Sequence, residues 1–143
     1  MNEAERALDL FRAGYNCSQA VLAAHGPELG LDKDACLKVA SAFGGGIART
    51  AGTCGAVTGA LMVIGLRHGG ITIEDPTRKA EVYEKGQEFM RRFAERNGSV
   101  VCRDLLGCDI STPEGRQQAK ERSLHATRCE QLLRDAAELL AEE

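Results

Sequence analysis

Residues 44–68 read GGGIARTAGTCGAVTGALMVIGLRH, a glycine-rich loop that leads directly into an apolar segment. Consecutive glycines accept positive φ angles and let another group approach the backbone closely. Thr53 is a favourable N-cap, which predicts that Cys54 lies on the first turn of a helix over residues 54–68. Because this segment is apolar or small on nearly every side, we expect its helix to lie at the centre of the fold.

Outward from this stretch, apolar residues recur at helical spacing, and capping residues and glycines separate the segments. No segment shows the alternation of apolar and polar residues that is typical of a strand. The pattern predicts an all-α fold, with residues 1–143 as a single domain of about six to seven helices packed around the helix over 54–68. The other expected helices cover residues 2–13, 17–24, 32–43, 75–96, 99–107 and the region from 112 to the end.

The charged residues are nearly balanced, with 18 Lys and Arg against 21 Asp and Glu and a net charge of −3. This balance, without a run of like charges, argues against binding to nucleic acid or to a membrane surface. The first residues, MNEAER, lack the pattern of a signal peptide, so we expect a cytoplasmic protein. In a reducing compartment, six cysteines are more typical of metal ligands or redox-active thiols than of disulfides.

Four of the six cysteines are expected in the first turns of four different helices. They are Cys17, Cys54, Cys102 and Cys129, with Asn16, Thr53, Ser99 and Thr127 as the expected N-caps. A helix N-terminus stabilises a thiolate through the helix dipole and the free N–H groups. If the four helix starts converge, the fold assembles a pocket for a metal, a cluster or a relay of exchanging thiols.

Two interpretations are open for Cys129. A helix that continues without interruption from residue 112 would place Cys129 on an apolar stripe. A break between residues 123 and 127, with Thr127 as the cap of a final helix, would place it in a first turn, and we favour the break because Thr127 is a capping residue.

Cys54 is the leading candidate for a catalytic thiol, with Cys17 as the second. A capped helix start and an open, glycine-rich approach predict that Cys54 has the lowest pKa of the six cysteines. The neighbouring glycines that we expect to let a bound cofactor approach are Gly44, Gly45, Gly46 and Gly55. The remaining two cysteines, Cys36 and Cys108, are interpreted as apolar core residues outside the site.

The other polar candidates carry weaker signals. His25, His68 and His125 are more typical of solvated or dipole-pairing histidines than of ligands. Arg49 would suit a thiolate or an anionic substrate, although a surface arginine is at least as common. The glycine run does not match a phosphate-binding loop, and no strand precedes it.

Two segments resemble the motifs of a redox-active family named for its C, GCAxxG, C, C cysteine pattern. GYNCSQAV at 14–21 looks like the family's first motif, and the stretch from FGGG at 43–46 to CGAVTGAL at 54–61 looks like its central one. Cys102 and Cys129 match the third and fourth cysteines. The order here is Cys-Gly-Ala, whereas the family name has Gly-Cys-Ala.

The resemblance covers nearly the whole chain and implies a helical fold with a cysteine-based redox or metal-binding role. Related modules look similar to a domain that is joined to haem in split-Soret cytochromes. This chain contains no CxxCH motif and therefore has no covalent haem site of its own.

Three functions fit these observations. The first is electron transfer through an iron–sulfur cluster or another thiolate-bound metal, because four thiolates are the usual ligand set. The second is a cofactor-free thiol–disulfide oxidoreductase in which Cys54 attacks. The third is a helical partner-binding module with structural cysteines. The first two imply a redox partner protein or a small electron carrier, and all three leave a homodimer open.

Overall fold

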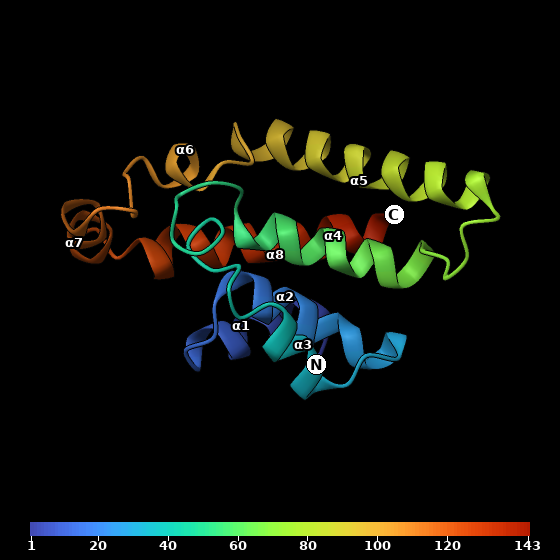
Figure 1. Ribbon diagram of the computed structural model, residues 1–143. Coiled ribbons are helices and arrows are strands. Elements are labelled where there is room, and N and C mark those ends of the chain that lie inside the picture. Colours follow the sequence, from blue (N-terminus) through green and yellow to red (C-terminus); the bar gives the residue numbers. More distant parts are fainter.

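The computed structural model describes residues 1–143 and confirms the expected all-α fold. Eight α-helices are joined by loops, one 3₁₀ turn and one π turn. The long apolar helix that follows the glycine loop lies among the other seven (Figure 1). The helices are α1 (Glu3–Arg12), α2 (Cys17–His25), α3 (Lys33–Val39), α4 (Gly55–His68), α5 (Pro76–Asn97), α6 (Cys102–Leu106), α7 (Pro113–Glu121) and α8 (Glu130–Glu142).

Helix α4 is the central element, as its composition predicted. It packs against α2, α5 and α8, with α5 along one side of the molecule and α1 to α3 along the other (Figure 1). Small residues allow this close packing, because a Cβ atom at Gly59 would lie only 2.8 Å from the Ser18 carbonyl oxygen. The helix begins one residue later than expected, so Cys54 is itself the N-cap, and Thr53 instead forms an isolated antiparallel bridge with Val101.

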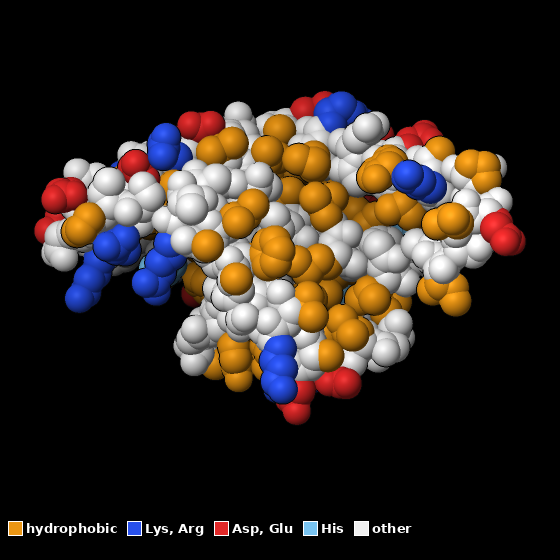
Figure 2. Space-filling view, viewed as in Figure 1, with side chains coloured by type: hydrophobic (Ala, Val, Ile, Leu, Met, Phe, Trp, Pro, Cys, Tyr) orange, Lys and Arg blue, Asp and Glu red, His pale blue; other side chains and the backbone are white.

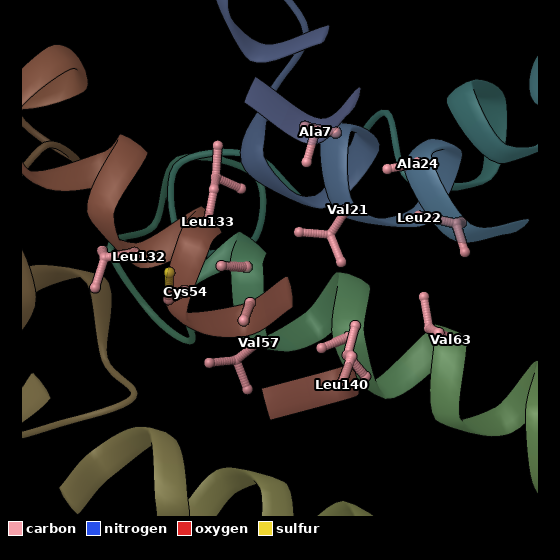
Figure 3. Close-up of a cluster of buried hydrophobic side chains, with 14 of the residues drawn as sticks. Ala7, Val21, Leu22, Ala24, Cys54, Val57, Val63, Leu132, Leu133 and Leu140 are labelled. Carbon is pink, nitrogen blue, oxygen red and sulfur yellow. The ribbon is translucent and has the colours of Figure 1, made fainter. Parts of the chain in front are cut away.

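The main hydrophobic core lies between α4 and its neighbours and also includes residues of α1, α3 and α6. Figure 3 shows part of it, with side chains from α2, α4 and α8 pointing toward one another. Each fully buried Leu, Ile, Val or Phe side chain contributes about 1.5–3 kcal/mol through removal of apolar surface from water. Among the side chains buried most completely are Leu22, Val57, Ile64, Phe93 and Leu133.

A second, smaller apolar cluster lies at the end of the molecule that carries α6 and α7 (Figure 1). Six buried residues form it, and three of them are cysteines. The members are Cys102, Leu106, Cys108, Ala119, Leu124 and Cys129, and Phe11, Cys17 and Ile110 pack against them. We call this group the thiol cluster.

One expected helix boundary is wrong, because helix α3 ends at Val39 rather than near residue 43, and Val39 is 56% exposed. The expected break between residues 123 and 127 is present, because α7 ends at Glu121 and Ser123 adopts a φ of 51°.

The chain then forms a π turn, His125–Cys129, that runs directly into α8. Thr127 is therefore not an N-cap, and its hydroxyl donates to the Ser123 carbonyl oxygen at 3.0 Å. Cys129 lies at the junction of the π turn and the α-helix rather than in a capped first turn.

The surface combines charged side chains with apolar side chains that gather across the middle of one face (Figure 2). The most exposed large apolar residues are Ile71 and Ile73, in the loop between α4 and α5. None of the helices has both the length and the apolar character needed to cross a membrane. The homodimer stays a prediction.

Candidate redox site

The four cysteines singled out in the sequence approach one another from four separate elements. Cys17 begins α2, Cys54 caps α4, Cys102 begins α6, and Cys129 ends the π turn. The Cys17 thiol lies close enough to the other three cysteines for each of them to raise its pKa. The fold therefore gathers thiols that are separated by most of the chain length.

Asn16 fixes the start of α2 as the sequence predicted. Its side-chain oxygen accepts from the Gln19 N–H at 2.8 Å, and the Gln19 side chain accepts from the Asn16 N–H at 2.9 Å, so the two residues form a capping box. The start of α4 packs directly against this turn, because a Cβ atom at Gly55 would lie 3.0 Å from the Cys17 Cβ. Gly55 thus permits a close helix contact, and its predicted role in cofactor binding stays untested.

Backbone hydrogen bonds join the Cys54 and Cys102 segments on either side of the Thr53–Val101 bridge. The Cys54 N–H donates to the Val100 carbonyl at 2.8 Å, and the Cys102 N–H donates to the Gly52 carbonyl at 2.6 Å. Ser99 does not cap α6 as expected, because its hydroxyl accepts from the Val101 N–H and α6 has no side-chain cap. The bridge, rather than a cap, holds Cys102 at the site.

The glycine loop contains a turn of left-handed backbone. Residues 45–49 have consecutive φ angles of 61°, 70°, 65°, 51° and 59°. The sequence predicted positive φ for glycines, but this run extends through Ile47, Ala48 and Arg49. Left-handed backbone at residues with a Cβ atom costs about 1–2 kcal/mol each, a cost that persists where surrounding contacts enforce it.

Hydrogen bonds close the loop onto itself and onto α6. The Ala51 N–H donates to the Gly45 carbonyl at 3.0 Å, and the Gly52 N–H donates to the Gly46 carbonyl at 2.7 Å. Gly46 faces the site, because a Cβ atom there would lie 2.7 Å from the Cys102 Cβ. Cofactor binding by Gly44, Gly45 and Gly46 stays a prediction. Gly46 lets the loop pack against α6, whereas Gly44 lies against the Asn16 side chain.

The Cys129 sulfur has the most favourable environment for a thiolate. A hydrogen bond from the Cys17 thiol and the nearby positive charge of Arg128 lower the pKa of Cys129, although burial opposes the shift. The same hydrogen bond, together with burial, raises the pKa of Cys17 well above its ordinary value. Cys17 is therefore the proton donor of this pair and Cys129 the acceptor.

Arg128 was not singled out in the sequence. Its guanidinium donates to the Leu105 carbonyl at 3.1 Å, to the Asn97 carbonyl at 3.2 Å and to the Asn97 side-chain oxygen at 3.4 Å. These bonds hold the cation against α6 and the end of α5, next to the thiols. Its position immediately before a motif cysteine was the one available signal, and the acceptors that fix it lie elsewhere in the chain.

The expectation that Cys54 has the lowest pKa is wrong. Cys54 is only 4% exposed and lies among apolar side chains that include Leu132 and Leu133 (Figure 3). Burial raises the pKa of Cys54 to about 11, although the N–H groups of Ala56 and Val57 act in the opposite direction. Burial likewise raises the pKa of Cys102 to about 12. The helix start does favour the thiolate of Cys54, but desolvation has the larger effect.

Of the two cysteines that were expected outside the site, one lies outside the thiol cluster and the other lies within it. Cys36 does lie outside the site, fully buried, with its thiol donating to the Leu31 carbonyl at 3.4 Å. Cys108 does not, because it belongs to the thiol cluster with Cys102 and Cys129. The placement of Cys108 outside the group was therefore wrong.

Two of the three histidines lie away from the thiols. His25 ends α2, where its Nδ1 lies 2.8 Å from the Val21 carbonyl oxygen and burial lowers its pKa. His68 ends α4 and pairs with Glu143 at 3.1 Å, which agrees with the dipole-pairing interpretation. The exposed ring of His125 lies edge-on to Phe11, with ring centroids 5.9 Å apart. Arg49 is exposed and forms no ion pair.

The spacing of the side chains determines whether the thiols can hold a metal ion. No group of three or more His, Cys, Asp or Glu side chains has a spacing that could hold a metal ion. A tetrahedral thiolate site needs four sulfurs about 2.3 Å from the metal. The side chains as they stand do not fit such a group, and metal ligation by the four cysteines stays a prediction.

The comparisons with known proteins agree with the cysteine pattern. The chain matches the family model described as "Putative redox-active protein (C_GCAxxG_C_C)" over residues 15–143. No curated protein and no solved structure gives a significant match. The matched region contains all four motif cysteines and every helix except α1. The protein therefore belongs to the C_GCAxxG_C_C family of redox-active proteins.

Proposed function

We propose that this protein is a thiol–disulfide redox protein in which Cys17 and Cys129 alternate between a dithiol and a disulfide. The observation that carries the proposal is that Cys17 packs against the cluster that contains Cys129, and that the two thiols shift each other's pKa in opposite directions. Two neighbouring thiols are the reduced form from which exchange with an incoming disulfide produces an internal disulfide.

Access favours Cys17 as the thiol that meets a substrate. It is the only one of the six cysteines that is partly exposed. Burial and the Cys129 thiol nevertheless raise its pKa. Cys129 is 6% exposed. An incoming disulfide from a partner protein or a small carrier therefore reaches the pair at Cys17.

The hydrogen bond supplies the proton transfer that this attack needs. As the Cys17 sulfur bonds to one sulfur of the incoming disulfide, its proton moves to Cys129, and the other substrate sulfur departs as a thiolate. Cys129 then loses the proton and attacks the Cys17 sulfur, which releases the second substrate thiol. The substrate gains two electrons, the one proton that Cys129 releases and a second proton from water, and the Cys17–Cys129 disulfide retains the oxidation.

This assignment differs from the alternative in which Cys54 attacks. Cys54 is protonated at neutral pH because burial raises its pKa to about 11, and its sulfur faces the core. In the proposed site, Cys54 packs beside the pair and helps to exclude water.

The test uses protein purified without oxygen, treated with glutathione disulfide, blocked at its free thiols with N-ethylmaleimide and then digested with trypsin. Cleavage at lysine and arginine places Cys17 in peptide 13–33 and Cys129 in peptide 129–134. We expect these two peptides to become linked and to separate again on reduction. Cys36→Ser serves as the matched control and should form the same link, whereas Cys17→Ser should not.

The other functions give different results in the same preparation. If both thiols stay free while the purified protein is brown and contains stoichiometric iron, the proposal is wrong and a cluster takes its place. If the protein is colourless, metal-free and unchanged in its thiol count, the partner-binding module is favoured. A link between Cys54 and another cysteine would support the earlier choice of Cys54 instead.

A further inference from the structure

Cys108 is the one cysteine of the thiol cluster that does not belong to the four-cysteine motif. It is 7% exposed, the same as Cys102, and both side chains lie in the cluster with Cys129. Cys102 and Cys108 also lie close enough for the second to raise the pKa of the first. The cluster thus contains a further thiol that the proposed Cys17–Cys129 reaction does not use.

Local backbone geometry explains this contact. Helix α6 ends at Gly107, whose φ of 69° is left-handed and whose N–H donates to the Arg103 carbonyl at 2.9 Å. A left-handed residue at this position reverses the chain and commonly brings the next side chain back against the last turn of the helix, which in the five-residue α6 includes Cys102. Here the next side chain is Cys108, and the first residue of the helix is Cys102.

We propose that Cys102 and Cys108 form a second dithiol–disulfide couple, which is oxidised by exchange with the Cys17–Cys129 couple. The exchange step rests on the proposed function, whereas the pairing of Cys102 with Cys108 rests on the α6 turn alone. Together the two couples allow the chain to hold four electrons rather than two.

Burial is the reason for internal exchange. Both thiols of the second couple are almost inaccessible, so a disulfide from solution does not meet them directly. Cys129 lies in the same cluster as Cys102 and links the inner couple to the accessible thiol Cys17.

The exchange takes place in two displacements. The Cys102 sulfur attacks the Cys129 sulfur of the Cys17–Cys129 disulfide, and Cys17 leaves and takes up a proton. The Cys108 sulfur then attacks Cys102, and Cys129 leaves as the second reduced sulfur. One disulfide forms, one is reduced, and the two protons of Cys102 and Cys108 pass to Cys17 and Cys129.

Peptide mapping distinguishes the two couples, because Cys102 lies in tryptic peptide 97–103 and Cys108 in peptide 104–116. Full-length protein, first reduced and freed of oxygen, is titrated with glutathione disulfide and sampled with time. We expect the link between 97–103 and 104–116 to appear after the Cys17–Cys129 link. Total uptake should reach two disulfide bonds per chain.

Three variants make the outcome decisive. Cys108→Ala should reduce the uptake to one disulfide bond, with the Cys17–Cys129 link retained. Cys17→Ala should slow the formation of the inner link at least tenfold, and Cys36→Ala, the matched buried control, should behave like the wild type. The helical circular dichroism of each variant shows that its fold is retained.

Absence of the inner link in the wild type overturns the second couple, whatever happens to Cys17 and Cys129. An inner link that forms equally fast in Cys17→Ala overturns the exchange step. An inner link in the wild type without a Cys17–Cys129 link contradicts the proposed function and leaves the Cys102–Cys108 pair in place. The failures of the two proposals are thus distinguishable.

Discussion

Arg128 is held by three oxygen acceptors and places a positive charge beside the thiols of Cys129 and Cys54. Its effect is opposite to that of burial, which disfavours the thiolates of the four motif cysteines. The pKa of Cys129 is therefore lower than that of the other motif cysteines because of two specific neighbours, the Cys17 thiol and the Arg128 guanidinium. A helix start alone does not lower the pKa of a thiol that is shielded from water.

The first prediction concerns this guanidinium. Arg128→Gln should raise the pKa of Cys129, because the thiolate loses its neighbouring cation, and slow its alkylation by iodoacetamide between pH 7 and 8 several-fold. The pH dependence of labelling measures the shift, followed in tryptic peptide 129–134 of the wild type and in peptide 123–134 of the variant, which lacks the cleavage site at residue 128. Lys120→Gln removes a charge from an exposed site without such contacts and should leave the profile unchanged. An unchanged profile in Arg128→Gln would show that Cys17 alone sets the pKa.

At the scale of single elements, the glycine loop and the helix caps have different effects. The loop places Gly46 against Cys102 and Gly52, so its shape determines how α6 approaches the site. A side-chain cap such as Thr112 on α7 stabilises its own helix through a local hydrogen bond. Substitutions in the two kinds of element should therefore be separable by measurements of stability and of thiol reactivity.

The second prediction separates close packing from backbone strain. In Gly46→Ala, the new Cβ would meet the Gly52 nitrogen at 2.6 Å and the Cys102 Cβ at 2.7 Å. We expect the loop to shift and Cys102 to react at least tenfold faster with a thiol reagent, while the helical circular dichroism is retained. Gly30→Ala is the matched control, because its φ of 96° carries similar strain and no atom lies within 4 Å. Its cost should be about 1 kcal/mol without a change at Cys102.

The third prediction concerns two threonines that looked alike in the sequence. Thr112 caps α7 and accepts from the Gly115 N–H at 2.9 Å, whereas Thr127 lies inside the π turn. Thr112→Ala should lower the free energy of unfolding by about 1 kcal/mol, because an N-cap bond is lost. Thr127→Ala should cost under about 0.5 kcal/mol, as expected for an exposed site. Urea denaturation of both variants tests the order, and a larger loss for Thr127→Ala would contradict it.

For the whole molecule, the thiol cluster and the main core form one continuous packed interior. Cys54 belongs to the main core, and Cys17 packs against both groups. The stability of the fold and the ionisation of the thiols are consequently linked, because a thiol that ionises in the folded state must do so away from water.

The fourth prediction follows from this linkage. The pKa of Cys54 is raised from 9.0 to about 11 in the folded protein. Its contribution to the free energy of unfolding is therefore fully present below pH 9 and is lost as the pH rises to 11. The expected loss is about 3 kcal/mol, at 1.36 kcal/mol for each pKa unit. Urea unfolding from pH 8 to 11 should therefore show a shallower decline in Cys54→Ala than in the wild type. Parallel declines would show that Cys54 is not shielded from water.

The sequence by itself determined the all-α class, the central helix and the cysteines that gather at the site. These features follow from local properties of the sequence. They depend on residues close together in the chain, namely the spacing of apolar residues, the Asn16 cap and the small residues of α4. The prediction was wrong where distant segments decide the result. Thr53 bridges to Val101 instead of capping α4, and residues 45–49 are held left-handed by contacts that a local propensity does not contain.

Only the tertiary structure decided the chemistry of each thiol. Whether a cysteine is ionised depends on the balance between burial and nearby charges, and both come from other parts of the chain. Leu132 and Leu133 of α8 help to bury Cys54, while Arg128, held by α6 and the end of α5, favours the thiolate of Cys129. Cys108 joined the cluster because a left-handed glycine reverses the chain after α6. Desolvation and charge act through space, and sequence separation does not reveal them.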